Sequence, residues 1–387
     1  MRILFIIQGE GRGHLTQALS LHQKLTADGH QVVGALVGKS PARKIPAFFI
    51  EKMKAPVYSF ESPNFLPTAR NKQVNLARSV VYNVARSYRY IGSLYYINRM
   101  IKQTEADVVV NFYEILTGLT YTLFRPKAVM ICIAHQYLFL HPEFSFPKAN
   151  PLSLGMMLFY TQVTAWGASK KLALSFRKMK EVPEKGIVVV PPLIRREVIE
   201  AKPSEGDYLH GYMLNSGFGE EVKLWHKAHP AVKIHFFWDK KGETEETRIN
   251  DNLVFHPIDD ALFVRYMAGS KAYATTAGFE SVCEAMYMDK PVMMVPTHIE
   301  QACNAHDACL SGAGIVSGSF NLDKLLELSV SYSSTHSPNL QFRHWVSQAD
   351  WLILREFHED SSSWLNHLRS RYNFFHSLIS PKKALKI

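Results

Sequence analysis

The 387-residue chain has little of what several protein classes require. Its four cysteines, Cys132, Cys283, Cys303 and Cys309, lack the spacing of a disulfide framework, so we expect reduced thiols. The aromatic and apolar stretch 137–165 is interrupted by prolines, which argues against a membrane span. The first residues have no hydrophobic leader pattern, so we expect no signal peptide and a cytoplasmic location.

Signatures of the common phosphate-binding loops and metal sites are also missing. Residues 8–14 (QGEGRGH) have neither the G-x-G-x-x-G spacing of dinucleotide-binding loops nor the G-K-[ST] ending of a Walker loop. His298, Cys303, His306 and Cys309 are close in sequence and could bind zinc. Cys303 and His306 are more simply explained as residues that line a helix packed on the preceding strand. We therefore expect neither a metal nor another cofactor.

The most informative segment that is present is 275–305, TTAGFESVCEAMYMDKPVMMVPTHIEQACNA. Residues 271–276 predict a short strand, Gly278 permits the turn that follows it, and residues 279–288 predict a helix that ends before Pro291. The first-turn amides of a helix lack intrahelical partners, and the helix dipole is positive at that end. This helix start is therefore suited to a phosphate group.

Side chains around this helix start complete a pattern typical of a nucleotide-sugar pocket. Ser281 could donate its hydroxyl to a phosphate, and Glu284, about one turn further, could accept from both hydroxyls of a ribose. Residues 291–296 predict a parallel strand that is buried on both faces. The residues that follow this strand and could bind sugar hydroxyls are His298, Glu300, Gln301 and Asn304. An isolated glutamate such as Glu280 or Glu284 often only complements the helix dipole, but the ordered combination favours a pocket.

A glycine-rich loop follows the first predicted strand. Residues 1–7 predict that strand, and residues 15–27 predict an amphipathic helix. The loop between them contains Gly9, Glu10, Gly11, Arg12 and Gly13. Its glycines let the backbone approach a ligand and free its amides for anions, and His14 at the helix entrance could take a proton near neutral pH. Taken alone, the loop is explained equally well as a turn with a helix-capping histidine.

The N-terminal glycine loop and the segment 275–305 together resemble the corresponding parts of the glycosyltransferases of the B-type fold (GT-B). The resemblance covers nearly all of residues 1–318. The group most similar to this chain contains the bacterial UDP-N-acetylglucosamine transferase of lipid-linked peptidoglycan precursor synthesis, and related predicted glycosyltransferases that open with G-x-G-x-G-H. In that family the second segment reads approximately G-x-x-T-x-x-E, then a K-P or L-P strand, then Q-Q-x-x-N-A. The matching residues here are Gly278, Ser281, Glu284, Lys290, Pro291, Glu300, Gln301, Asn304 and Ala305.

The resemblance implies a role for several of the matching residues. Ser281 would contact phosphate, Glu284 the ribose and Gln301 the donor sugar. His14 would match the family's N-terminal loop histidine, which acts as a base or holds the acceptor. Gly217, in a second strand-to-glycine loop, would approach the diphosphate, although a plain turn explains it equally well.

Some positions depart from the family pattern. The usual loop is Gly-Gly-Thr-Gly-Gly-His, whereas this chain carries Glu10 and Arg12, and Glu300 replaces the first glutamine of the pair. The donor sugar and the acceptor therefore stay open. The Asp-x-Asp motif that holds a divalent ion in the other major glycosyltransferase fold does not occur, since Asp259 and Asp260 are adjacent and suit a helix cap.

Length and pattern predict an α/β protein of two facing Rossmann-like domains, with the ligand cleft between them. A chain of 387 residues is too long for one ordinary core. Strand–helix alternation in both halves predicts parallel sheets with helices on both faces. The expected parts are an acceptor domain (1–192), a linker (193–207), a donor domain (208–330), and bracing helices with a basic tail (331–387).

The charge of the chain bears on its partners. The formal net charge is +10, and segment 70–102 interleaves basic residues, tyrosines and aliphatic residues. Such a segment could lie on the anionic inner face of the plasma membrane and reach a lipid-linked acceptor. It is explained at least as well as domain helices with solvated faces. The groove-reading helix or stacking platform of a nucleic-acid-binding protein is not evident, so we expect no nucleic-acid partner.

These observations predict transfer of a sugar from a nucleoside-diphosphate sugar, with a UDP-sugar favoured, to an acceptor hydroxyl. His14, or Glu10 beside it, would deprotonate the acceptor, and the helix start at Gly278 would stabilise the leaving diphosphate. Direct displacement would invert the anomeric carbon. Two alternatives stay open: a nucleotide-sugar epimerase of the same fold, and a non-catalytic protein that binds nucleotide sugars or nucleic acid.

Overall fold

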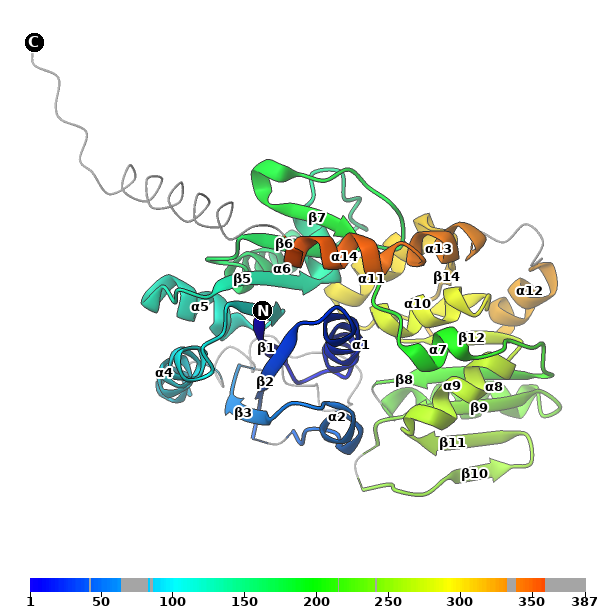
Figure 1. Ribbon diagram of the computed structural model, residues 1–387. Helices are drawn as coiled ribbons and strands as arrows, with labels where there is room; N and C mark the ends of the chain where they lie inside the picture. Colours follow the sequence, from blue (N-terminus) through cyan, green and yellow to red (C-terminus); the bar gives the residue numbers. More distant parts are fainter. Residues whose placement is uncertain are drawn as a thin grey trace, which may run out of the picture.

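The computed structural model describes residues 1–41, 43–63, 83, 86–214, 216–240, 242–332 and 339–358. They form two seven-stranded sheets that occupy separate halves of the molecule, with helices packed around each (Figure 1). The part of segment 70–102 that covers 70–82, 84 and 85 lies outside the described residues, as does the basic tail.

The first sheet is parallel throughout and has the order β3-β2-β1-β4-β5-β6-β7. Its strands are β1 (Arg2–Gln8), β2 (Gln31–Lys39), β3 (Val57–Glu61), β4 (Val108–Phe112), β5 (Val129–Ala134), β6 (Lys170–Leu174) and β7 (Ile187–Val190). Its helices are α1 (Gly13–Ala27), α2 (Ala47–Lys52), α4 (Ser87–Gln103), α5 (Ile115–Phe124) and α6 (Pro151–Thr164), with short 3₁₀ helices η1 (His135–Leu140) and η2 (Pro183–Lys185). The central strands β1 and β4 are apolar runs because helices cover both faces of the sheet.

The second sheet has the order β10-β11-β9-β8-β12-β13-β14, and only the β10–β11 pair is antiparallel. Its strands are β8 (Tyr208–Met213), β9 (Lys233–Trp238), β10 (Thr247–Asn250), β11 (Leu253–Pro257), β12 (Ala272–Thr275), β13 (Val292–Met294) and β14 (Gly314–Val316). The helices around it are α7 (Arg196–Glu200), α8 (Gly219–Ala228), α9 (Asp260–Gly269), α10 (Phe279–Tyr287), α11 (Ile299–Leu310) and α12 (Asp323–Ser331), with a 3₁₀ turn η3 (Ser216–Phe218). The expected α/β architecture of two Rossmann-like halves is confirmed.

The segment between the two sheets is more ordered than its composition indicates. We read 193–207 as a charged linker, but it contains helix α7, and Leu193, Ile194 and Val198 are buried. Apolar residues at these positions anchor the segment between the two halves. The linker interpretation therefore missed a structured connection whose charged residues take part in the packing.

The last described helices return to the first half of the molecule. Helix α13 (Asn339–Val346) packs on α10, and α14 (Ala349–His358) packs on α1 and β7. Trp345 of α13 donates its indole N–H to the carbonyl of Ser175 (2.9 Å). These helices therefore connect elements of both sheets. No helix among the described residues is long and apolar enough to cross a bilayer.

Candidate functional site

The first glycine loop lies where β1 ends and α1 begins, at the boundary between the two halves (Figure 1). The amide of Gly9 donates to the carbonyl of Gly38 (2.8 Å), so the loop lies against the end of β2. The backbone N–H of Ser40 donates to Glu10 Oε1 at 2.5 Å, which holds the Glu10 carboxylate at this strand end. A Cβ on Gly11 would meet open space, whereas one on Gly13 would collide with the carboxylate of Glu280. Gly13 thus permits a close approach between the two halves.

Arg12 and Gly217 come from loops of opposite halves. The Arg12 guanidinium lies 5.7 Å from the ring centroid of Phe48, and its carbonyl accepts from the amide of Thr16 (3.0 Å). Gly217 lies in η3, directly after β8, and is partly buried. Both loops stand at carboxyl ends of central strands, which is the edge where α/β sheets bind ligands.

His14 is the second residue of α1 and lies against aromatic and polar neighbours. Its Nδ1 is 3.2 Å from Gln17 Oε1, and its ring centroid is 5.7 Å from that of Tyr113. Burial lowers the pKa of His14, and this effect is opposed by the nearby Glu300 carboxylate and by the Gln17 contact. The neutral imidazole is therefore favoured, and this is the form in which a histidine can accept a proton.

Gln17 connects His14 to the second half of the molecule. Its Nε2 donates to Oε1 of Glu280, which lies in the first turn of α10. Burial raises the pKa of Glu280 to about 7; hydrogen bonds from its own backbone and from Gln17 oppose this, while Glu284 and Glu300 add to it. The loop histidine and the helix start that the sequence singled out are thus brought together through two side chains.

The start of α10 has the backbone geometry of a ligand site. Gly278 is the N-cap residue, with no side chain to occupy the first-turn amides. Ala277 before it has a positive φ of 61°, a conformation that costs energy for a residue with a Cβ and that often occurs at functional sites. Asn304 Nδ2 donates to the carbonyl of Ala277 (3.3 Å), and Ser281 Oγ donates to the carbonyl of Gly278 (3.2 Å). Asn304 thus supports the loop from α11.

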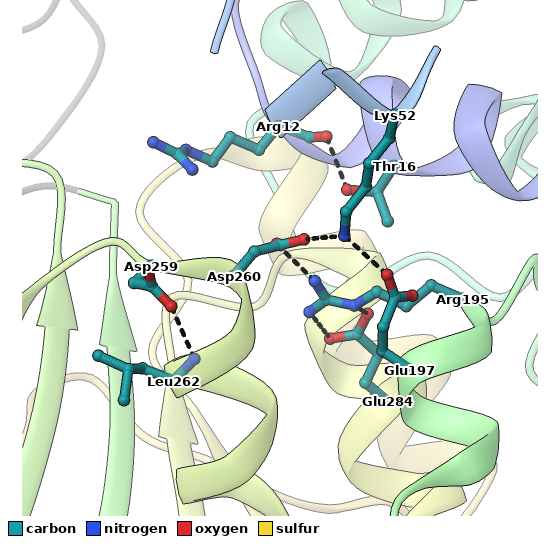
Figure 2. Close-up of polar contacts among 9 residues, drawn as sticks. All are labelled: Arg12, Thr16, Lys52, Arg195, Glu197, Asp259, Asp260, Leu262 and Glu284. Carbon is teal, nitrogen blue, oxygen red and sulfur yellow. Dashed lines mark hydrogen bonds and ion pairs between the residues drawn. The ribbon is translucent and has the colours of Figure 1, made fainter. Parts of the chain in front are cut away.

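Glu284 is held by an arginine from the connecting segment. Arg195 donates from Nε to Glu284 Oε1 (2.6 Å) and from Nη2 to Oε2 (2.8 Å), while its Nη1 donates to Asp260 (2.5 Å) (Figure 2). Lys52 from α2 joins the network by donating to Asp260 (3.1 Å) and Glu197 (2.7 Å). Burial raises the pKa of Glu284, and the guanidinium of Arg195 opposes that shift.

Glu300 and Gln301 lie in the first turn of α11. Gln136 of the first half donates from Nε2 to Glu300 Oε1 (2.7 Å). Gln301 Oε1 accepts from the amide (2.9 Å) and the hydroxyl (2.7 Å) of Thr297, the residue before the N-cap of α11. Glu300 therefore lies at the boundary between the halves, whereas the hydrogen bonds of Gln301 stay within the second half.

Two further residues at this boundary were not singled out from the sequence. Tyr113 follows β4 with a positive φ of 61°, and its hydroxyl is 2.7 Å from Thr161 Oγ1. Glu114 caps α5 by accepting from the amide of Leu116 (3.1 Å) and also accepts from the hydroxyl of Ser62 (2.7 Å). Burial raises the pKa of Glu114 to about 7. The sequence feature that could have identified these two residues is the segment N-F-Y-E at the end of a buried strand.

The residues that we considered for zinc do not converge. Among the described residues, the one group of metal-ligating side chains within 4.8 Å of one another is Asp28, His30 and His358. His358 Nε2 lies 2.7 Å from Asp28 Oδ2, and His30 Nε2 lies 3.2 Å from the same oxygen. This group joins the end of α1 to the end of α14, and its contacts are ion pairs when the histidines are protonated.

Comparison with known proteins identifies the family and the fold. Residues 1–327 match the model of glycosyl transferase family 1. The fold is similar to that of the spinosyn rhamnosyltransferase SpnG complexed with spinosyn aglycone (TM-score 0.59, 14% identity, covering 93% of this chain and 100% of that one). It is also similar to CalG4, the calicheamicin glycosyltransferase (TM-score 0.59, 13% identity, 98% and 99%), and to UGT89C1 of Arabidopsis thaliana complexed with quercetin (TM-score 0.57, 14% identity, 95% and 98%).

No curated protein sequence matches the chain. The family match spans well over half of the sequence, and the structural neighbours share the GT-B fold over almost their whole length. The chain therefore belongs to glycosyl transferase family 1 and is a glycosyltransferase of the GT-B fold.

Proposed function

We propose that the protein transfers a sugar from a UDP-sugar to an acceptor hydroxyl, with inversion at the anomeric carbon and without a metal ion. The observation that carries this proposal is the meeting of His14 and the α10 start, connected through Gln17 and Glu280. A general base and a phosphate-binding helix start must both lie near the anomeric carbon for direct displacement. His14 belongs to the first half of the molecule and the α10 start to the second half, and the two lie together where the halves meet.

The departing diphosphate would bind at the start of α10. The first-turn amides other than that of Glu280, which its own carboxylate occupies, and the positive end of the helix dipole would stabilise the negative charge that develops on the leaving oxygen. Ser281 would add its hydroxyl, and Gly217 would let the second loop approach. Helix-start charge stabilisation of this kind requires no cation, and activity that is unchanged by a chelator would support the metal-free step.

Glu284 keeps the capacity to bind a ribose while it is paired with Arg195. Each carboxylate oxygen can accept two hydrogen bonds, and each uses one on the guanidinium. The Arg195 pair would then fix the orientation of Glu284 toward the two ribose hydroxyls. Gln301 and Glu300, at the start of α11, would contact the donor sugar.

The acceptor would bind against the first half of the molecule. His14, or Glu10 on the same loop, would take the proton of the acceptor hydroxyl. A lipid-linked acceptor is compatible with an apolar surface on helices α4, α5 and α6, which follow one another in packing. We define the apolar surface by the exposed side chains of these helices and of the turn after α6: Tyr88, Ile91, Tyr95, Leu123, Leu152, Met156, Phe159 and Trp166.

Basic residues accompany that surface. Arg99 and Lys102 are exposed on α4, so their attraction for anionic headgroups would add to the insertion of the apolar side chains. We therefore propose peripheral binding to an anionic membrane, in the cytoplasm, as the setting of the reaction.

Membership of the transferase family favours sugar transfer over the activity of an epimerase or of a non-catalytic binding protein.

Calorimetric titration with UDP, GDP and ADP tests the donor site directly. We expect UDP to bind best, and Glu284→Gln and Ser281→Ala each to weaken UDP binding by about 1–3 kcal/mol, as for loss of a buried hydrogen bond to a charged or polar group. Glu197→Gln is the matched control, because Glu197 pairs with Lys52 of the same network outside the proposed pocket. Unchanged UDP affinity in both pocket variants would contradict the assigned donor site.

A further inference from the structure

The His14 imidazole can act as a base only if its proton is on the correct nitrogen. A neutral imidazole carries one proton, and the nitrogen without it is the acceptor. Nδ1 faces Gln17 Oε1, and no hydrogen bond to Nε2 forms within the described residues. A proton on Nδ1 would therefore leave the Nε2 lone pair free for an acceptor hydroxyl. The neighbour of Nδ1 decides whether this tautomer is favoured.

Gln17 alone cannot fix the tautomer. A glutamine amide presents either an oxygen, which accepts, or an NH₂ group, which donates, and the two can exchange by a flip. If the oxygen faces His14, Nδ1 must carry the proton. If the NH₂ group faces His14, the proton moves to Nε2, and the nitrogen free of protein contacts can no longer accept. Gln17 is buried, with an exposed fraction of 1%, so its partners within the protein determine the choice.

Glu280 supplies the missing constraint. An ionised carboxylate only accepts hydrogen bonds, so Gln17 must turn its NH₂ group toward Glu280 and its oxygen toward His14. The groups around the Glu280 carboxylate are Gln17, the Glu280 amide, Glu284 and Glu300. The absence of a side chain at Gly13 leaves the space that this carboxylate occupies.

We propose that Glu280 is a positioning residue that acts through Gln17 to hold His14 with its proton on Nδ1 and its Nε2 free to accept. Glu280 belongs to α10 of the second half, whereas Gln17 and His14 belong to α1 of the first. The base is therefore set for proton transfer only while the two halves are in contact. The catalytic consequence rests on the proposed function, but the tautomer does not.

The tautomer can be measured without any substrate. Protein labelled with ¹⁵N-histidine is studied by long-range ¹H–¹⁵N correlation at pH 8, above the Glu280 pKa of about 7, with His14→Gln used to assign the signal. We expect the wild type to show His14 with its proton on Nδ1. Glu280→Gln keeps the shape but can both donate and accept, so we expect a mixture of tautomers, and Gln17→Leu should abolish the preference.

Glu220→Gln is the control for the spectroscopic measurement. Glu220 also lies in the first turn of a helix of the second half, but its side chain is 81% exposed and pairs with Lys223. It should leave the His14 signal unchanged. A wild-type proton on Nε2, or the same tautomer in the wild type and in Glu280→Gln, would overturn the proposal.

Kinetics then separate the proposal from the proposed function. If His14 is the base, Glu280→Gln should lower kcat on the order of 10- to 100-fold, a part of what a general base contributes. Glu280→Asp, which keeps an acceptor-only group, should recover part of the rate. A tautomer that responds to Glu280 while His14→Gln transfers sugar at the wild-type rate would support the positioning role and reject His14 as the base.

Discussion

Arg195 binds both carboxylate oxygens of Glu284 through two nitrogens of one guanidinium, at 2.6 and 2.8 Å. Arg195 lies in the segment that connects the two sheets, and Glu284 lies on α10. A planar, bidentate pair of this kind fixes the direction of the carboxylate as well as its charge. Because Asp260 also accepts from Arg195, the pair fastens the connecting segment to two helices of the second half.

Replacement of Arg195 should be costly for folding. Arg195→Met would leave Glu284, with 3% of its surface exposed, without its partner, and loss of one member of a buried pair costs about 3–5 kcal/mol. Urea unfolding followed by fluorescence measures the change. The control is Arg196→Met, since Arg196 forms an exposed pair with Glu200 and should change the unfolding free energy by about 0.5 kcal/mol or less. Equal effects of the two variants would contradict the buried-pair interpretation.

Two helical glycines should respond to alanine in opposite directions. A Cβ on Gly118 of α5 would collide with the carbonyl of Val163 of α6, so Gly118→Ala must push the two helices apart, at about 1–3 kcal/mol. Gly92 of α4 has open space around a Cβ, and alanine there should stabilise by about 0.5–1 kcal/mol through helix propensity. Thermal unfolding compares the variants. A Gly118→Ala protein as stable as Gly92→Ala would show that α5 and α6 are not in this contact.

The sequence predicted the sheets better than it predicted the site. Apolar runs such as β13 and helix starts such as α10 depend on local patterns, so they were found to within a few residues. The role of Arg195 was missed because an arginine in a charged segment is normally solvated, and its partner Glu284 is 89 residues away. Such pairing over a long separation is decided by the fold, and no local pattern records it.

The residues that directly follow buried strands are also candidates for the site that a sequence can identify. Strand β4 is a buried apolar run, but no role was predicted for the tyrosine and the glutamate directly after it. In a parallel sheet the residues after each strand share one edge with the ligand loops. Tyr113, in contact with His14, and Glu114, near Glu10, could have been proposed for the site on that argument. Glu280 lies at the predicted helix start, yet its contact with Gln17 depends on how the two halves meet.

Glu114 should make stability fall as the pH rises. Its pKa is about 7 in the folded protein against 4.5 when unfolded, so between these values the folded state keeps a proton that the unfolded state has lost. The contribution of Glu114 to the free energy of unfolding therefore decreases from pH 4.5 to pH 7 and is constant above pH 7. The free energy of unfolding lost over this range is on the order of 3 kcal/mol, because each unit of pKa difference contributes about 1.4 kcal/mol.

Glu114→Gln should remove that part of the pH dependence, because an amide does not titrate. Urea unfolding at pH 5 and pH 8 gives the comparison, and the variant should gain relative to the wild type at the higher pH. Because the pKa of Glu280 is also about 7, the unfolding free energy of the variant should still decrease with pH, but less steeply than that of the wild type. Glu51→Gln, on an exposed position of α2, should run parallel to the wild type. Parallel curves for Glu114→Gln would mean that this carboxyl titrates normally in the folded protein.

The apolar surface should mediate binding to anionic membranes. Leu152 and Phe159 of α6 are 73% and 60% exposed, and inserting such side chains into the bilayer interface adds to the attraction between basic residues and headgroups. We expect the wild type to sediment with vesicles that contain phosphatidylserine and much less with neutral vesicles, and Leu152→Ser with Phe159→Ser to reduce sedimentation at least several-fold. Leu224→Ser is the control, because Leu224 is 71% exposed on α8 of the second half. Equal loss in the control, or no binding by the wild type at low salt, would reject the membrane surface and favour a soluble acceptor.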